Sequence, residues 1–404
     1  MLVLPSMTID ILCKVVDNFG DIGVVYRLAK ALGDCDKALQ LRLIVDDLFA
    51  FQKLAPAVNP ALAYQQLFTW QLFRWDTPWD TSVHEKPSLV LECFSCGRPA
   101  WFEALLFDTE DARIRWIIDI EHLSAEEFAE DFHLMPSLTR SSRVKKMMFM
   151  PGFTEKTGGL IIDRAFKQLC DSYARSDKDD ADSYRGHAAL AKLRLDWARR
   201  VALESAVPYG AEEHLWIPIF TYVRSFERIV ADLAVFNQDK KLLVFAAAGP
   251  SQDCLISAWK KAGRPFPLIE LAFLRQELWD ELLLASDFSI VRGEESLSRA
   301  ALAGKPFLWH AYALEGEHQL VKVQALLTHL QRFIPEDLFE EYAQLSIAFN
   351  DRTIDGGNLP RSVNILPFLK NEARLHQSFK NLAQVLLNRP DMACRLLTFI
   401  RNLV

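Results

Sequence analysis

The sequence has no excess of basic residues, and this absence excludes one large class of partners. Lysine and arginine number 46 against 53 aspartates and glutamates, the formal net charge is −7, and no block rich in lysine or arginine occurs. Binding to a nucleic-acid backbone depends on a field of positive charge that releases counterions. A nucleic-acid partner is therefore not expected.

Long apolar runs and a leader peptide are also missing. The first sixteen residues are apolar, but Asp10 and Lys14 interrupt them, and they have neither a basic start nor a small-residue cleavage site. No later run reaches the ~18 uninterrupted apolar residues that a membrane span needs. We interpret the start of the chain as a buried first strand and expect a soluble protein without a membrane partner.

Glycine and proline are scarce, at 16 and 18 of 404 residues, while half of the residues are apolar and a quarter are charged. This composition is typical of a folded globular protein. The seven cysteines are odd in number and scattered, which predicts free thiols in a reducing compartment and a cytoplasmic location. A chain of 404 residues exceeds what one hydrophobic core usually fills, so two domains are expected.

Several catalytic motifs are absent as well. The sequence contains no H-E-x-x-H, no G-x-S-x-G, no Walker lysine and no G-x-G-x-x-G. Cys93 and Cys96 have C-x-x-C spacing, but a tetrahedral zinc site needs two more ligands and no second pair lies nearby. Metallohydrolases, serine hydrolases, dehydrogenases and P-loop enzymes are thus disfavoured, and no metal is expected.

What the chain does contain is an alternation of strand-length apolar runs with amphipathic stretches, which predicts an α/β fold with parallel sheets. The expected strands of the first half are 9–16, 41–45, 89–94 and 115–120, with a helix over 22–32. The second half is expected to have strands at 215–222, 242–248, 267–273, 288–291 and 306–310, with helices at 225–236, 251–262, 276–286 and 295–303. That pattern is five strands with four crossover helices.

Two further segments suggest how the domains are divided. The polar, charge-rich stretch 175–186 is interpreted as a surface loop or linker, because it cannot bury enough apolar surface to be ordered alone. The tail from about 365 has a helical pattern up to Pro390, so a terminal helix is expected to cross back onto the first domain. The predicted domains are 1–185, joined by a helix over about 380–404, and 205–375.

Candidate chemistry in the first domain follows the first strand. Asp17 and Asp21 lie in the sequence DNFGDIG, and loops at the carboxyl ends of parallel strands line ligand crevices. The alternative is that Asp21 only caps the helix beginning near residue 22. Glu121 and His122 follow a later strand of the same sheet and are a weaker candidate, since a lone histidine there is more often structural.

In the second domain the segment 288–296 reads as a strand, a turn and the start of a helix. A helix N-terminus binds anions such as a diphosphate, Arg292 adds a charged fork, Ser296 a hydroxyl and Glu294 a carboxylate for sugar hydroxyls. The alternative makes Glu295 and Ser296 ordinary first-turn residues and Arg292 a surface ion pair. Aromatic residues at strand ends nearby, at 220, 222 and 273, suit a base pocket but are also common in cores.

Taken together, these segments resemble the EarP family, the bacterial elongation factor P arginine rhamnosyltransferases. The likeness spans nearly the whole chain and is carried by DNFGDIG at 17–23, FLRQ at 273–276, VRGEES at 291–296 and AGKPFLWH at 303–310. Segments 122–126 and 152–160 are also similar. Glu295 stands where the family more often has aspartate, and Arg275 where it often has proline.

The resemblance implies a GT-B fold, with two Rossmann-like domains facing a central cleft, the acceptor domain first and the donor domain second. It implies an enzyme that moves L-rhamnose from dTDP-β-L-rhamnose to an arginine of elongation factor P, with inversion and without metal. Asp21 is then the general base and Asp17 its companion. The implied donor-binding residues are Phe19, Gly20, Phe220, Tyr222, Phe273, Gln276, Arg292, Gly293, Glu294, Glu295 and Ser296.

Two other functions stay open at this point. A GT-B transferase that uses another nucleotide sugar on a small molecule would have the same fold, because a fold alone does not fix a substrate. A catalytically inactive GT-B module that binds a partner is the second alternative, although the presence of Asp17, Asp21, Arg292 and Glu294 argues against loss of the site.

Overall fold

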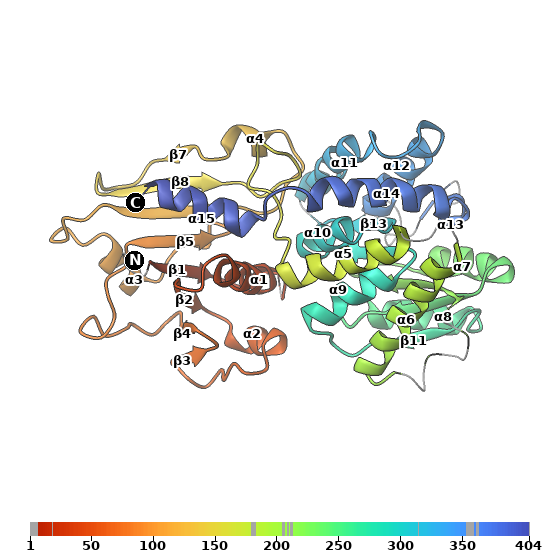
Figure 1. Cartoon of the computed structure of the whole chain (residues 1–404), viewed down its shortest axis with the longest axis horizontal. Coiled ribbons are helices and arrows are strands. Elements are labelled where there is room, and N and C mark those ends of the chain that lie inside the picture. The colour runs from red at the N-terminus through yellow and green to blue at the C-terminus, as the bar shows by residue number, and fades with distance from the viewer. Residues whose placement is uncertain are drawn as a thin grey trace. The chain divides into compact units, whose positions relative to one another are not determined.

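The computed structural model describes residues 7–403, apart from 18, 179–182, 204–206, 208–209, 211–212, 314, 353–358 and 361–362. The chain divides into two compact units, whose elements are labelled in Figure 1. The first unit comprises Met1–Arg164 and Arg389–Val404, and the second comprises Ala165–Asn388. Each unit contains one sheet, which confirms the predicted α/β class.

The boundaries of these units differ from the expected 185 and 380. Helix α5 (Arg164–Lys178) belongs almost wholly to the second unit, where the Arg299 guanidinium lies 3.9 Å from the centre of the Phe166 ring. Helix α14 (Glu372–Leu387) also stays in the second unit, and only α15 (Met392–Leu403) returns to the first. The difference arises from side-chain contacts of α5 and α14 that composition does not reveal.

The first sheet has eight strands in the order β3-β4-β2-β1-β5-β6-β8-β7. Its six inner strands are parallel, and β3 and β7 pair antiparallel at the two edges. Four inner strands were predicted, whereas β3, β4, β7 and β8 have mixed polar patterns and were not. The strands are β1 (Thr8–Cys13), β2 (Gln40–Val45), β3 (Tyr64–Leu67), β4 (Trp70–Arg74), β5 (Leu89–Cys93), β6 (Arg115–Ile120), β7 (Pro136–Ser137) and β8 (Val144–Phe149).

Two hydrophobic cores lie on the two faces of this sheet, because successive side chains of a strand point to opposite faces. On one face Ile9 and Ile11 of β1 pack with α1 (Gly20–Cys35), α2 (Leu48–Leu54) and α15. On the other face Leu12 packs with residues of α3 (Ala100–Leu106). The short helix α4 (Phe128–Phe132) follows β6.

The C-terminal helix α15 is attached to the first unit in three ways. The backbone N–H of Met392 donates to the carbonyl of Leu160, and Leu396 and neighbouring apolar residues join the core beside α1. A disulfide links Cys35, the last residue of α1, to Cys394. The expectation of free thiols is therefore wrong for these two cysteines, since residues far apart in the sequence meet only once the chain has folded. Cys13, Cys93, Cys96, Cys170 and Cys254 are free.

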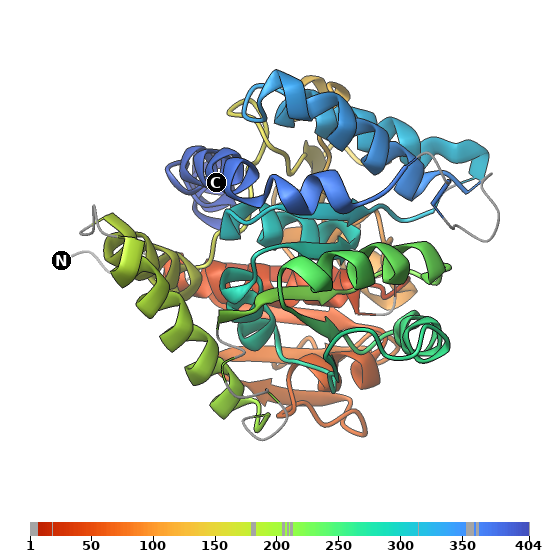
Figure 2. The ribbon, with the colours of Figure 1, turned by 90° about the vertical axis from the view of Figure 1, so that its right-hand side faces the viewer.

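The second sheet is wholly parallel, in the order β11-β10-β9-β12-β13. Its crossover helices contact each other in two pairs, α7 with α8 and α9 with α10. Figure 2 shows this unit facing the viewer. The predicted five strands and four crossover helices are confirmed. These elements are β9 (Leu215–Ile219), α7 (Glu227–Asp239), β10 (Leu242–Ala246), α8 (Gln252–Lys261), β11 (Leu268–Glu270), α9 (Gln276–Ala285), β12 (Ser289–Arg292), α10 (Gly293–Ala303) and β13 (Phe307–His310).

Further helices complete the second unit. They are α6 (Ser183–Arg200), α11 (His318–Leu330), α12 (Glu336–Asn350) and α13 (Leu366–Lys370). The predicted loop over 175–186 is wrong at both ends, because α5 runs to Lys178 and α6 begins at Ser183, while 179–182 lie outside the described residues. Charged residues form helices readily, so high charge alone did not define a loop. Strand β11 is also shorter than the expected 267–273.

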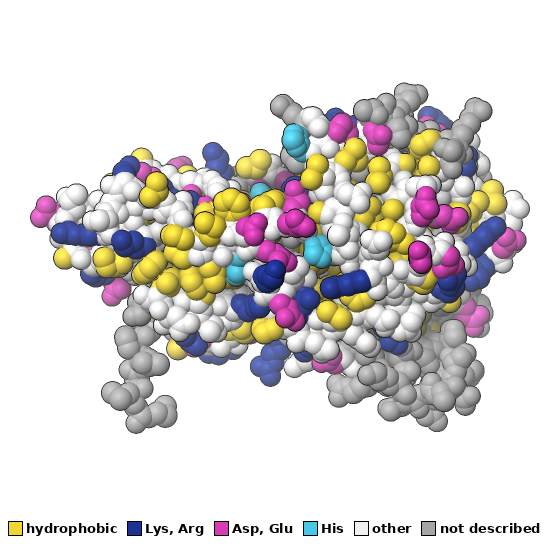
Figure 3. Space-filling view, turned by 90° about the horizontal axis from the view of Figure 1, so that it is seen from above, with side chains coloured by type: hydrophobic (Ala, Val, Ile, Leu, Met, Phe, Trp, Pro, Cys, Tyr) yellow, Lys and Arg dark blue, Asp and Glu magenta, His cyan; other side chains and the backbone are white. Residues whose placement is uncertain are grey.

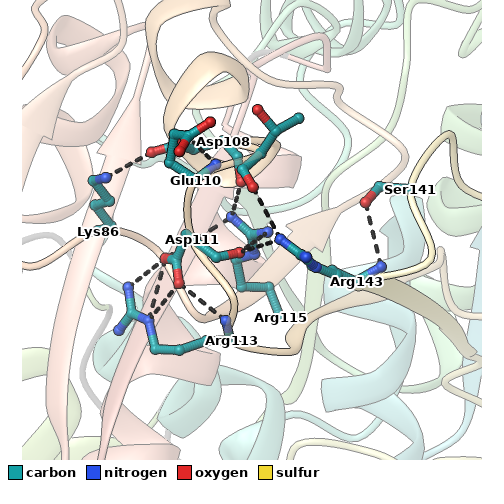
Figure 4. A network of polar contacts seen from close by, with 9 residues as sticks. Lys86, Asp108, Glu110, Asp111, Arg113, Arg115, Ser141 and Arg143 are labelled. Carbon is teal, nitrogen blue, oxygen red and sulfur yellow. Dashed lines mark hydrogen bonds and ion pairs between the residues drawn. The ribbon is translucent and has the colours of Figure 1, made fainter.

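A polar network lies at the amino ends of β5 and β6 (Figure 4). Arg115, which is 1% exposed, donates to the carbonyls of Asp108 and Asp111, and Arg143 donates to the same carbonyl of Asp111. Lys86 donates to the Asp108 carboxylate at 2.6 Å. These charged groups bond backbone carbonyls and one another, so we assign a structural role to this end of the sheet.

One face of the molecule carries charges of both signs close together. Figure 3 shows lysines and arginines intermixed with acidic side chains over the face that it displays, without a broad field of either sign. Within the described ranges, no helix combines the length and the apolar character needed to cross a bilayer.

Candidate active site

Asp21 lies in the first turn of α1, directly after the loop that follows β1. Its side chain is 6% exposed, and its Oδ2 accepts the backbone N–H groups of Val16 at 2.8 Å and Asp17 at 3.0 Å. The helix N-cap is Phe19, which makes no side-chain capping bond. Asp21 thus braces the preceding loop. It does not cap its own helix, so the alternative of a simple capping residue is wrong. Among the described residues, no hydrogen-bond donor contacts its Oδ1.

Asp17 lies over the start of the same helix. The backbone N–H of Gly20 donates to the Asp17 carbonyl at 2.6 Å, and a Cβ on Gly20 would lie 3.0 Å from Asp17 Oδ2. Glycine at position 20 therefore allows the carboxylate to approach the helix N-terminus closely. Phe19 packs against the core cluster of the first unit. The structure brings Asp17, Phe19, Gly20 and Asp21 together at one strand-to-helix junction.

Arg292 ends β12 in the second unit and is buried, at 8% exposed. Its guanidinium carbon lies 4.5 Å from the centre of the Phe220 ring and 4.7 Å from that of Tyr222. A guanidinium packed on aromatic rings is held in one orientation and loses part of its hydration. The alternative of an exposed surface ion pair is therefore wrong for this residue.

The helix that follows Arg292 begins with the other residues of the predicted diphosphate loop. Gly293 has φ +64°, and a Cβ there would lie 3.3 Å from Tyr222 Oη, so both backbone and space favour glycine. Ser296 is buried, and Glu294 lies 3.3 Å from Lys322 Nζ. Glu295 stands in the first turn of α10, at the end of the helix that favours negative ligands and side chains.

The predicted base pocket is spread over two loops. Phe220 and Tyr222 follow β9, and Phe220 lies 5.5 Å, ring centre to ring centre, from Trp279 of α9. Gln276 is the first residue of α9 and is buried, while Phe273 lies in the loop before it and is 39% exposed. Both loops leave the carboxyl end of the same parallel sheet, where ligands of such sheets bind.

Sequence reasoning missed several residues around Arg292. His310 is paired with Arg292 in the register of β12 and β13, and its ring lies 5.4 Å from Tyr222. Burial and the charges of Arg224 and Arg292 lower the pKa of His310 well below its usual value, which keeps the imidazole neutral. Burial also lowers the pKa of Arg224 to about 9. Two signals were available for His310, its strand-end position and its place in the segment 303–310 that carries the family likeness.

The described residues offer little for a metal. One group of potential ligands lies close enough together, namely Cys35, Asp391 and Cys394, and its two cysteines are bonded to each other. Cys93 and Cys96 are free thiols whose pKa values burial raises, that of Cys96 to about 12. Neither cysteine belongs to a group of three potential ligands among the described residues.

Comparison with solved structures defines the class of protein first. The fold is that of the GT-B glycosyltransferases. The chain aligns with the structure described as the structural basis for EarP-mediated arginine glycosylation of translation elongation factor EF-P, with a TM-score of 0.58, 22% identity and 98% and 99% of the two chains covered. It also aligns with a UDP-glucosyltransferase from Polygonum tinctorium, with a TM-score of 0.51, 9% identity and 99% of each chain covered.

Sequence comparison then defines the family. Residues 9–401 match the family described as elongation factor P (EF-P) rhamnosyltransferase EarP, and the chain belongs to this family. It is 32% identical to the protein-arginine rhamnosyltransferase of Pseudomonas putida, covering 98% of this chain and 99% of that one. It is 30% identical to the enzyme of the same name from Shewanella oneidensis, with 97% of each chain covered. The protein is therefore a protein-arginine rhamnosyltransferase.

Proposed function

We propose that this enzyme transfers L-rhamnose from dTDP-β-L-rhamnose to an arginine side chain of translation elongation factor P, with inversion at the anomeric carbon. The observation that supports it most is the surroundings of Asp21, a buried carboxylate with one oxygen bonded to two loop amides and the other uncontacted by described donors. The acceptor and the family function come from the relatives. Because that acceptor acts in translation, we also propose a cytoplasmic location.

The proposed chemistry begins with the acceptor. A guanidinium keeps its proton to very high pH and spreads its lone pairs over three nitrogens, so it is a weak nucleophile. Asp17 and Asp21 stand four positions apart at one strand end, and two carboxylates can hold the planar fork and localise its electrons. Asp21 Oδ1 takes the proton as the nitrogen attacks, because Oδ2 already accepts two backbone N–H groups.

The leaving group is assigned to the second unit. As the new bond between nitrogen and the anomeric carbon forms, the bond from that carbon to the phosphate oxygen breaks, and its electron pair stays on dTDP. Arg292 and the positive end of the α10 helix dipole would stabilise this charge, with Ser296 as a further donor. Positive charge supplied by the protein makes a divalent cation unnecessary, so we propose a metal-independent reaction.

The thymidine is assigned to the aromatic loops. Phe220 and Tyr222 flank the Arg292 guanidinium, and Phe273 has an exposed ring on the neighbouring loop. A base stacks well on such rings, and the Gln276 amide has both a donor and an acceptor for a pyrimidine edge. Glu294, Glu295 and Gly293 complete the proposed donor loop, and Phe19 and Gly20 are proposed to approach the sugar.

A donor and acceptor panel tests this proposal. Purified protein is incubated with EF-P and, in turn, dTDP-rhamnose, UDP-glucose or GDP-mannose, and EF-P is analysed by mass spectrometry. We expect modification with dTDP-rhamnose alone, and no modification of EF-P whose acceptor arginine is replaced by lysine. Transfer from another nucleotide sugar to a small molecule, with EF-P unmodified, would point to a different GT-B transferase.

A further inference from the structure

The loop after β5 has an unusual backbone. Phe94 and Ser95 are consecutive, neither is glycine, and their φ angles are +61° and +48°. Side chains disfavour this left-handed region, and residues held there cluster at ligand sites. Gly97, at φ +71°, follows in the same loop. The protein therefore maintains a costly conformation at the carboxyl end of a central strand.

A buried polar network holds this loop in place. Ser95 Oγ donates to Asp119 Oδ2 at 3.1 Å, and Asp119 is only 1% exposed. Asp119 also bonds Lys146 at 2.6 Å. The N–H of Gly97 donates at 2.9 Å to Glu92, a second buried carboxylate. Such a network overdetermines the loop, so the two left-handed residues reflect a specified shape and not a chance turn.

This shape presents a flat pair of rings. The Phe94 ring and the His122 imidazole lie 4.5 Å apart, centre to centre, and are inclined by only 16°. Phe94 is half-buried against the core of the first unit, whereas His122, after β6, is exposed. Phe94 thus packs against one face of the imidazole, and the two rings form a nearly planar stack. We call these two rings the stacking platform.

The loop that carries Phe94 is next to the loop that carries the two aspartates. Strand β5 pairs with β1, and Cys96 Sγ, in the platform loop, donates to the carbonyl of Leu12 near the end of β1. Asp21 is near enough to Cys93, the residue before Phe94, that its charge adds to the effect of burial in raising the pKa of that thiol. The carboxylates and the platform therefore occupy neighbouring loops at the carboxyl ends of the parallel strands.

We propose that Phe94 and His122 form the stacking surface for the guanidinium of the acceptor arginine. A guanidinium has a planar face that stacks on aromatic rings and an edge of N–H donors that pairs with carboxylates. The platform and the neighbouring aspartates offer one partner to each. A lysine ammonium has no planar face, so this pairing would contribute to selection of arginine. The inference rests on the proposed function, whose acceptor it describes in more detail.

Steady-state kinetics with intact EF-P at saturating dTDP-rhamnose test this inference. The variants Phe94→Leu and His122→Ala each remove one ring, and we expect each to raise the KM for EF-P about 3- to 30-fold. His122→Phe restores a flat ring and should stay near the wild-type KM. Affinity for dTDP-rhamnose, measured by calorimetry, and the melting temperature should change little in all three variants.

The chain supplies a matched control. Phe68 also has a positive φ, +55°, is 63% exposed, and its ring centre lies 5.4 Å from that of Trp70. It precedes β4, however, and therefore lies at the opposite end of the parallel strands from Phe94. Phe68→Leu should leave the KM for EF-P unchanged. An unchanged KM in both Phe94→Leu and His122→Ala would overturn the inference, as would equal losses of donor affinity and melting temperature. If the wild type does not modify EF-P at all, the proposed function fails instead.

Discussion

At the scale of single residues, the two oxygens of Asp21 have different surroundings. Oδ2 is committed to the amides of Val16 and Asp17, which fixes the plane of the carboxylate. Among the described residues no donor contacts Oδ1, which leaves this oxygen for the proton transfer that we propose. The same carboxylate also braces the loop, so a substitution has to keep its shape if catalysis alone is to be tested.

Asp21→Asn meets that requirement. The amide is isosteric and its oxygen can still accept the loop N–H groups, but it cannot take a proton. We expect the transfer rate to fall by ~10²–10⁴, while dTDP-rhamnose affinity measured by calorimetry stays within about twofold. Transfer at the wild-type rate would reduce Asp21 to a brace for the loop.

Arg292 is the residue on which the proposed donor site depends most. Arg292→Ala should weaken binding of both dTDP and dTDP-rhamnose by ~1.5–3 kcal/mol, because a charged hydrogen bond is lost. Arg292→Lys should recover only part of the affinity, since an ammonium cannot match the fork or stack on the rings of Phe220 and Tyr222. EDTA should not change wild-type transfer. Unaltered dTDP affinity in Arg292→Ala, or transfer that EDTA abolishes, would contradict the site.

The sequence predicts a site residue when the pattern that indicates it lies in the residues beside it. Asp21 and Arg292 were identified because each follows an apolar run at a strand end. His310 was overlooked as a site residue because its proximity to Arg292 depends on strand order, which places β13 beside β12. The roles proposed for the site residues came from the family resemblance and stay predictions.

At the scale of elements, His133 joins the segment after α4 to the end of β8. Its Nδ1 accepts the N–H of Met150 at 3.2 Å, and this bond needs a neutral imidazole. Burial, with a smaller contribution from Arg395, lowers the pKa of His133 to about 4. The polar residues around position 133 did not predict this contact.

A pH series tests that contact. The folded pKa lies below the unfolded value of about 6.5, so the stabilisation is complete above pH 6.5 and is lost as the pH falls toward 4. Partial exposure screens the effect to roughly 1–2 kcal/mol. His133→Asn keeps an acceptor for Met150 but does not titrate, so its free energy of unfolding should vary less between pH 7 and 4 than that of the wild type. Identical slopes would contradict the assignment.

The pairing of α1 with α15 is the element-level feature that the sequence concealed. Cys35 and Cys394 are 359 positions apart, and their spacing gave no reason to join them. Alkylation of the unfolded, unreduced protein should label the five free cysteines, and reduction first should raise the number to seven. Seven labels without reductant would mean that the disulfide is absent. The strands that are continuous apolar runs, by contrast, were predictable because a buried parallel sheet favours such runs, whereas β4 and β8 have mixed polar patterns and were not predicted.

At the scale of the whole molecule, the proposed reaction uses a protein as its acceptor. Holding a long, flexible arginine against two carboxylates costs rotamer entropy, and contacts elsewhere on the acceptor can offset that cost. A short peptide that spans the acceptor arginine should therefore have a much lower kcat/KM than intact EF-P at equal concentration. Equal values would show that recognition is confined to the arginine and its neighbours.

The most direct measurement is the intact mass of EF-P after incubation with dTDP-rhamnose and either the wild-type enzyme or Asp21→Asn, followed by fragmentation to locate the modified residue. We expect the addition of one deoxyhexose, on one arginine, by the wild type alone. No added mass with the wild type, modification of a residue other than arginine, or equal modification by Asp21→Asn would contradict it.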